Sequence, residues 1–81
     1  MMLRIATQTT RPAAEVLDQA VAFFGPGSVG LELRDRAPDH VTFEGGGGFV
    51  TVDVVPDRDT RDVTVVTQEW EHDARLFIEQ V

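Results

Sequence analysis

The chain has 81 residues, with 14 acidic against seven basic side chains and a formal net charge of −7. This length suits one small domain, residues 1–81, and the acidic balance argues against nucleic acid and anionic membranes, which attract clustered cations. Cysteine is absent, which excludes disulfides, thiolate catalysis and cysteine metal sites. Because no apolar run suits a signal peptide or a membrane span, we expect a cytoplasmic protein.

The first third of the chain predicts a strand and then a helix. Residues 3–7 alternate apolar and polar side chains, which is typical of a half-buried strand. Residues 13–24 place apolar side chains at helical spacing and charged ones opposite. We expect Thr9 or Thr10 to cap this helix, and Gly25, Pro26 and Gly27 to end it, with glycine supplying a left-handed cap and proline preventing continuation.

The remaining chain predicts four strands and a second helix. Period-2 alternation occurs in residues 29–34, 40–44, 50–54 and 62–65. Such alternation indicates an antiparallel sheet with one covered face and one open face. Apolar side chains from Trp70 to Val81 then recur at helical spacing, with Thr67 as a possible N-cap and Trp70 as a core anchor.

This element order predicts an α+β two-layer sandwich, in which an antiparallel meander of four to five strands carries both helices on one face. The order β-α-β-β-β-β-α resembles the TATA-binding-protein-like and helix-grip architectures over the whole chain. The first resemblance implies a sheet face that meets DNA, and the second implies a cavity for hydrophobic ligands. Glu32, Glu44 and Asp53 on the open face argue against DNA, and valine-rich strands favour a filled cavity.

Four consecutive glycines at residues 45–48 are the most distinctive motif. Matching the apolar faces of the flanking strands sets Phe43 opposite Val50, so the glycines can form a hairpin. This register allows a two-residue type I′ turn at Gly46 and Gly47 or a four-residue loop over residues 45–48. A phosphate-binding loop would need a following lysine or helix, whereas a strand follows here. The number of glycines exceeds what a turn requires, which would suit a mobile tip or the close approach of a partner's backbone.

The open face predicts a row of polar residues, Arg34, His40, Asp53 and Thr64, across neighbouring strands. A histidine beside a carboxylate could act as a general acid–base pair, but no serine or cysteine nucleophile accompanies it. Cross-strand charge pairing on a solvated sheet is the favoured interpretation, and no catalytic residue is assigned. The candidate binding residues lie on the open face and the hairpin: Arg34, His40, Asp53, Phe49, Gly46 and Gly47.

No metal site or other cofactor is expected. The two histidines, His40 and His72, lie in different predicted elements without the spacing of a zinc-binding helix. The loop at residues 56–62 contains three aspartates but lacks the glycine and glutamate of a calcium-binding loop.

We therefore expect a small non-catalytic interaction or assembly module. It would pair with further copies of itself or with a protein partner through a sheet edge or the open face, without nucleic acid or membrane. One alternative is a small-ligand-binding domain of helix-grip type for apolar or zwitterionic molecules. The other is an enzyme that uses His40 and Asp53.

Overall fold

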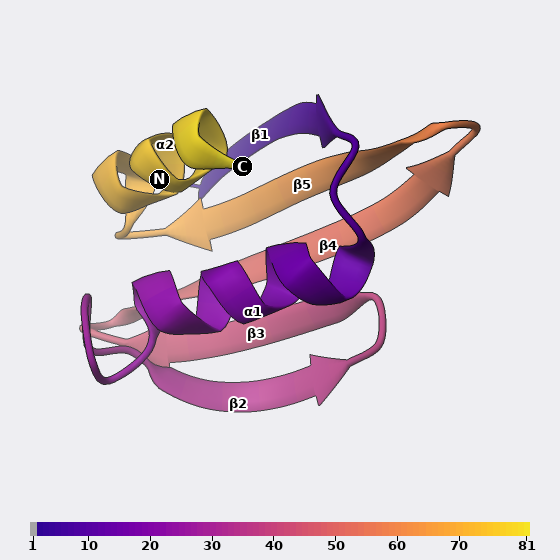
Figure 1. Ribbon diagram of the computed structural model, residues 1–81. Coiled ribbons are helices and arrows are strands. Elements are labelled where there is room, and N and C mark those ends of the chain that lie inside the picture. The colour runs from indigo at the N-terminus through magenta and orange to yellow at the C-terminus, as the bar shows by residue number, and fades with distance from the viewer. Residues whose placement is uncertain (1) are drawn as a thin grey trace.

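The computed structural model describes residues 2–81 and has the expected order of elements (Figure 1). Strand β1 (Met2–Thr9) leads into helix α1 (Ala13–Phe24), and helix α2 (Glu71–Gln80) follows the last strand. Between the helices lie β2 (Glu32–Ala37), β3 (His40–Gly45), β4 (Gly48–Asp57) and β5 (Thr60–Gln68). The predicted α+β class and layout are confirmed.

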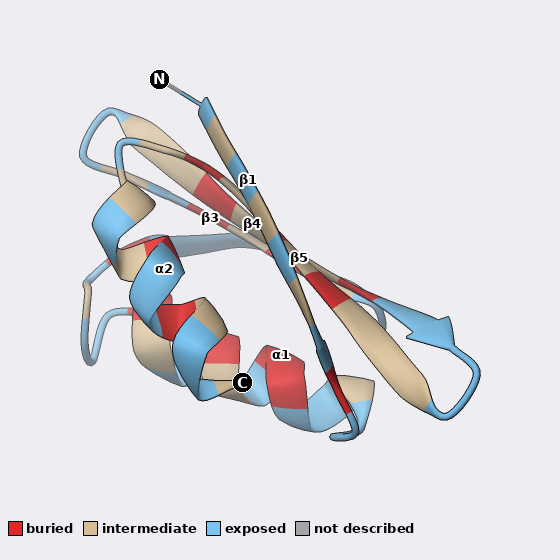
Figure 2. Cartoon of the chain, turned by 90° about the horizontal axis from the view of Figure 1, so that it is seen from above, coloured by how far each residue is buried: buried red, intermediate tan, exposed pale blue. Residues whose placement is uncertain are grey.

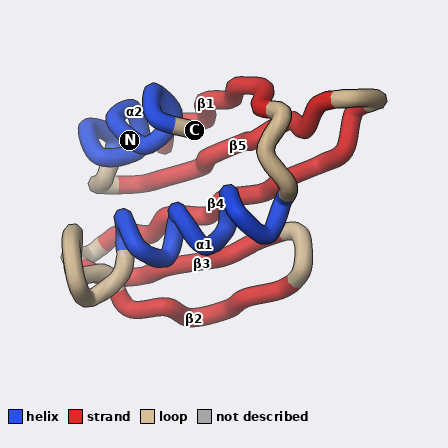
Figure 3. The backbone as a smooth tube through the Cα atoms, viewed as in Figure 1, coloured by secondary structure: helices blue, strands red, loops and turns tan. Residues whose placement is uncertain are grey.

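The five strands form one antiparallel sheet in the order β1-β5-β4-β3-β2 (Figure 3). Strands β2 to β5 make the predicted meander, and β1 pairs with β5, so that β1 and β2 are the two edges. The predicted pairing of Phe43 with Val50 is confirmed, and Val41 faces Val52 in the same register.

Both helices cover the same face of the sheet (Figure 2). Helix α1 packs over β3 and β4, and α2 packs over β5 and β1. The space between the two layers is filled by 14 apolar residues that are at most 2% exposed: Val16, Leu17, Ala20, Phe24, Leu31, Val41, Phe43, Val50, Val52, Val54, Val63, Val65, Ala74 and Phe77.

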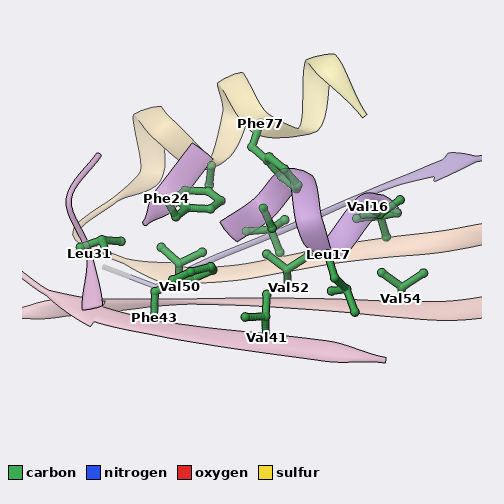
Figure 4. Packing of buried hydrophobic residues seen from close by; sticks show 14 residues of the cluster. Val16, Leu17, Phe24, Leu31, Val41, Phe43, Val50, Val52, Val54 and Phe77 are labelled. Atoms are coloured by element: carbon green, nitrogen blue, oxygen red, sulfur yellow. The ribbon is translucent and has the colours of Figure 1, made fainter. Parts of the chain in front are cut away.

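The phenylalanines join the two helices to the sheet (Figure 4). The ring of Phe24 in α1 lies 5.3 Å from that of Phe77 in α2 and 5.6 Å from that of Phe43 in β3, measured between centroids. Trp70 is half-buried and packs against this core from its margin, so it is less central than predicted.

The ends of α1 differ from the prediction. Pro12 is the N-cap and forms no side-chain cap bond, while the Thr9 hydroxyl accepts a hydrogen bond from the Arg11 backbone N–H at 3.2 Å. The threonine therefore stabilises the turn before the helix. Gly25 has an extended conformation with φ −73°, and the left-handed residue is Gly30, at φ 95°.

Helix α2 begins later than predicted because β5 is longer. Thr67 is a buried residue of β5, and its hydroxyl donates to the Phe49 carbonyl at 2.7 Å, so it cannot cap the helix. The chain turns at Glu69, which has φ 79°, and the helix N-cap is Trp70 without a side-chain cap bond.

A β-bulge in β2 changes which side chains reach the open face. The strand starts at Glu32 rather than at residue 29, and its register with β3 shifts between Leu33 and Asp35. Beyond the bulge, Asp35 faces Thr42 on the open side. Arg36 faces Val41 on the helix side, where its guanidinium pairs with Asp18 of α1.

The glycine hairpin has a two-residue turn with Gly45 paired to Gly48, which is one of the two loops that the predicted register allows. Gly46 and Gly47 have φ 59° and 83°, the positive values that a type I′ turn requires. The flanking glycines are explained by packing within the chain. A Cβ on Gly45 would lie 2.7 Å from Leu31 Cδ2, and a Cβ on Gly48 would lie 2.0 Å from the Gln68 carbonyl oxygen. Trp70 Nε1 also donates to the Gly45 carbonyl at 2.9 Å.

This close approach makes Gly48 sensitive to substitution. We expect Gly48→Ala to lower the free energy of unfolding by about 1 to 3 kcal/mol, because backbone must move to admit the methyl group. Gly27→Ala is the control, since a Cβ there meets nothing within 4 Å, and we expect it to be neutral. Urea denaturation measures both, and equal effects at the two positions would contradict the packing explanation.

Glu69 offers the opposite test, because its left-handed backbone strains any residue with a Cβ. We expect Glu69→Gly to raise the free energy of unfolding by about 1 kcal/mol. Glu15→Gly, the same change in an exposed turn of α1, should lower it by about 0.5 to 1 kcal/mol. Thermal or urea unfolding of both variants measures whether the free energy of unfolding changes in opposite directions. A lower stability of Glu69→Gly would show that the backbone at this position is not strained.

Candidate functional site

The sheet face opposite the helices is uncovered within residues 2–81 (Figure 2). Strand pairing sets its rows of side chains. One row runs from Ala37 through His40, Asp53 and Thr64 to Ala6, from the β2 edge to the β1 edge. The predicted neighbours His40, Asp53 and Thr64 are therefore confirmed as one row, and Arg34 does not belong to it.

His40 contacts carboxylates other than the one predicted. Its Nε2 lies 2.8 Å from Asp35 Oδ2, and its Nδ1 lies 3.2 Å from Asp39 Oδ1. Asp39 directly precedes β3, and Asp35 reaches the ring because the bulge turns it to the open face. The sequence pattern missed both partners, since regular alternation would have placed Arg34 in this position.

The two carboxylates raise the pKa of His40 above its ordinary value of 6.5. The hydrogen bond to Asp35 is the largest cause, followed by the hydrogen bond to Asp39, while desolvation acts in the opposite direction. A protonated imidazole donates from both ring nitrogens and satisfies both carboxylates. The cluster therefore fastens the bulged edge strand to β3, and it leaves no free ring nitrogen to serve as a base.

A shallow, solvent-open depression of about 530 Å³ lies on the same face beside the glycine hairpin. Arg34, Glu44, Phe49 and Gln68 are among its lining residues, together with hairpin backbone at Gly47. Arg34 forms ion pairs there with Glu44 at 3.4 Å and with Glu32 at 3.5 Å. All three charged side chains are more than half exposed, so these pairs contribute little stability.

The candidate residues are thus only partly brought together. Arg34, Phe49 and Gly47 share the depression, whereas His40 and Asp53 lie outside its lining. Gly46 turns toward Trp70, because a Cβ on Gly46 would lie 2.6 Å from Trp70 Cζ2. Ser28, the single serine of the sequence, lies in the loop between α1 and β2, so no serine stands beside His40.

Two of the three aspartates at the β4–β5 hairpin accept hydrogen bonds from a neighbouring side chain. Gln8 Nε2 donates to Asp62 Oδ1 at 2.9 Å and to Asp57 Oδ2 at 3.3 Å. Across residues 2–81, no group of three or more potential ligands is arranged to hold a metal ion. In the same range, no helix has the length and apolar character that crossing a bilayer requires.

The two edges of the sheet differ in chemistry. Strand β2 contains a bulge and four charged side chains among six residues: Glu32, Arg34, Asp35 and Arg36. Strand β1 pairs with β5 without a register shift over all eight of its residues, and its single charged side chain is Arg4. Bulges and charges are the devices that keep edge strands from pairing with other chains. The β2 edge has these devices and the β1 edge lacks them.

Apolar side chains also lie along the β1 edge. Leu3 and Ile5 point to the helix-covered side, where they pair with the buried Thr67 and Val65, yet both are only half-buried. Ile78 of the neighbouring helix α2 is half-buried as well. The sequence contained the signal in its regular, proline-free alternation, but it could not show that this strand lies at an edge.

The His40 cluster predicts a pH dependence of stability. Because the folded-state pKa lies above 6.5, the stabilisation is fully present below about pH 6.5 and is lost as the pH rises through the folded-state value. We expect His40→Gln to remove this loss between about pH 6 and 8.5, whereas His72→Gln on exposed helix surface should retain it. Urea denaturation midpoints across this pH range measure the loss of stability. The same dependence of the midpoint on pH in both variants would contradict a stabilising role of the His40 cluster.

Comparison with known proteins supports the fold alone. No family model matches the chain, and no curated protein sequence matches it. Its structure is similar to the crystal structure of DR_A0006 from Deinococcus radiodurans, a structural genomics target, with a TM-score of 0.62. The similarity covers 99% of this chain and 93% of that chain at 15% sequence identity, so what the two proteins share is the arrangement of strands and helices.

Proposed function

We propose that this domain is a non-catalytic assembly module, in which the edge of β1 pairs with the β1 strand of a second copy. The difference between the two edges carries the proposal. One sheet has a bulged, highly charged edge at β2 and a regular, nearly uncharged edge at β1. A monomer needs charges or a bulge at both edges to prevent unwanted strand pairing. An edge that pairs with another chain in the functional assembly needs neither.

The backbone supplies the attraction. An edge strand has a row of N–H and C=O groups that point away from the sheet, and an added strand can hydrogen-bond to them. Figure 2 looks onto the β1 end of the sheet, and no other helix or strand of residues 2–81 lies in front of β1. An eight-residue strand without proline or bulge can accept such a partner along most of its length.

The side chains favour the same edge. A second copy would cover the half-buried Leu3 and Ile5, and removing apolar surface from water stabilises the pair. The net charge of −7 makes copies repel one another in general. The one charged side chain of β1 is a cation, so the strand itself adds no negative charge to this repulsion.

The other candidate functions receive less support. The 14 buried core residues occupy the space in which a helix-grip protein would hold its ligand. The ring of His40 is engaged by Asp35 and Asp39, which disfavours the acid–base role with Asp53. The bulge adds Asp35 to the acidic open face and turns Arg36 away from it, which lowers the expected affinity for nucleic acid further.

Sedimentation equilibrium tests the proposal. We expect the wild-type chain to sediment as a dimer at micromolar concentration, and Thr7→Lys to shift it to monomer. The new lysine would point to the helix-covered side and would be enclosed by the second copy. Ala37→Lys, the control, places the same charge on the β2 edge and should leave the dimer intact.

Circular dichroism confirms that both variants fold. A wild-type chain that stays monomeric up to about 1 mM, a concentration that would detect even a very weak dimer, would refute the proposal. Equal loss of dimer in Thr7→Lys and Ala37→Lys would also refute it, because the effect would then not be specific to β1.

A further inference from the structure

We infer that the two β1 strands pair antiparallel about a two-fold axis at Ile5. The axis passes between the two copies of this residue, so that each Ile5 faces its own symmetry mate. The inference rests on the proposed function and specifies its geometry. The five strands of each copy would then form one continuous sheet, with the helices of both copies on the same face. A two-fold axis is the commonest symmetry of soluble oligomers, and it closes the assembly at two chains.

The pleat of the strand restricts the position of the axis. Opposed residues of an antiparallel pair point to the same side of a sheet. In β1, Leu3, Ile5 and Thr7 share the helix-covered side, because they pair with the buried residues of β5, and the even-numbered residues share the open side. An odd-numbered residue of β1 must therefore face an odd-numbered one, and an even-numbered residue an even-numbered one. This condition requires that one residue of the strand face its own symmetry mate at the axis.

Three positions near the middle of the strand satisfy this condition. An axis through Arg4 would oppose the two Arg4 side chains, and like charges directly opposite are unfavourable. It would also leave the last three residues of β1 unpaired. This position is the least favourable of the three.

An axis through Ala6 would use Thr9 as a pairing residue opposite Leu3. Thr9 is buried, and its hydroxyl accepts the Arg11 backbone N–H where the chain turns toward α1. The open side would set Arg4 against Gln8, whose amide already bonds to Asp62 and Asp57. This position therefore requires existing contacts to be rearranged.

An axis through Ile5 avoids these conflicts. On the covered side it opposes Ile5 to its symmetry mate and Leu3 to Thr7, so that the half-buried apolar side chains of both copies meet. On the open side it opposes Arg4 to Ala6, a small and exposed residue that leaves room for the guanidinium. The register uses residues 2–8 and leaves Thr9 in its present turn.

The facing of Arg4 and Ala6 allows a test by charge. Ala6→Glu would create two symmetric glutamate–arginine pairs, and we expect it to tighten the dimer roughly three- to tenfold. Ala6→Arg would oppose arginine to arginine and should weaken the dimer by a similar factor. The double variant Arg4→Glu/Ala6→Arg restores opposite charges and should recover at least the wild-type affinity.

The controls are Ala14→Glu and Ala14→Arg on an exposed position of α1, which change the net charge equally but lie away from β1. Dissociation constants from sedimentation are compared within each pair of variants. With the axis on Ala6, each new charge would face its own symmetry mate, so both Ala6 variants would weaken the dimer.

The possible results separate the two claims. Tightening by Ala6→Glu beyond the effect of Ala14→Glu supports the Ile5 axis. Weakening or no change in Ala6→Glu, in a chain that does dimerise through β1, overturns the register and leaves the proposed function standing. A wild-type chain that does not associate overturns both.

Discussion

The alternation of side chains along five antiparallel strands is the constraint on which the rest of the structure depends. It collects six valines and Phe43 on one face of the sheet, where each is almost fully buried. A chain of 81 residues can build one such layer of core, so both helices must cover the same face. Within residues 2–81, the other face and the two outer strands consequently remain uncovered, and the proposed function uses one of these strands.

Local and periodic features of the fold could be predicted from the sequence. Matching apolar faces determined the pairing of Phe43 with Val50, and the positive φ angles at Gly46 and Gly47 follow from the short turn between them. Contacts distant in sequence could not be predicted. The side chain of Leu31 approaches Gly45 and the backbone of Gln68 approaches Gly48, and these close contacts explain the two glycines that the turn itself does not require.

The candidate site was predicted only in part, and the β2 bulge is the reason. One extra residue at the position of Arg34 exchanges the sides to which the following side chains point. The local composition gives no signal of this bulge. Asp35 therefore reaches His40, and Arg36 turns to the helix side. The unprotected edge was equally hidden, because it depends on the pairing of β1 with β5 across most of the chain.

The proposed dimer depends on backbone hydrogen bonds of β1, so amide hydrogen exchange tests it most directly. Exchange would be followed residue by residue at dilute and at high protein concentration. We expect amides of β1 to become protected as the concentration rises, whereas those of the bulged β2 edge do not change. Exchange in β1 that is independent of concentration, or protection that appears at β2 instead, would contradict it.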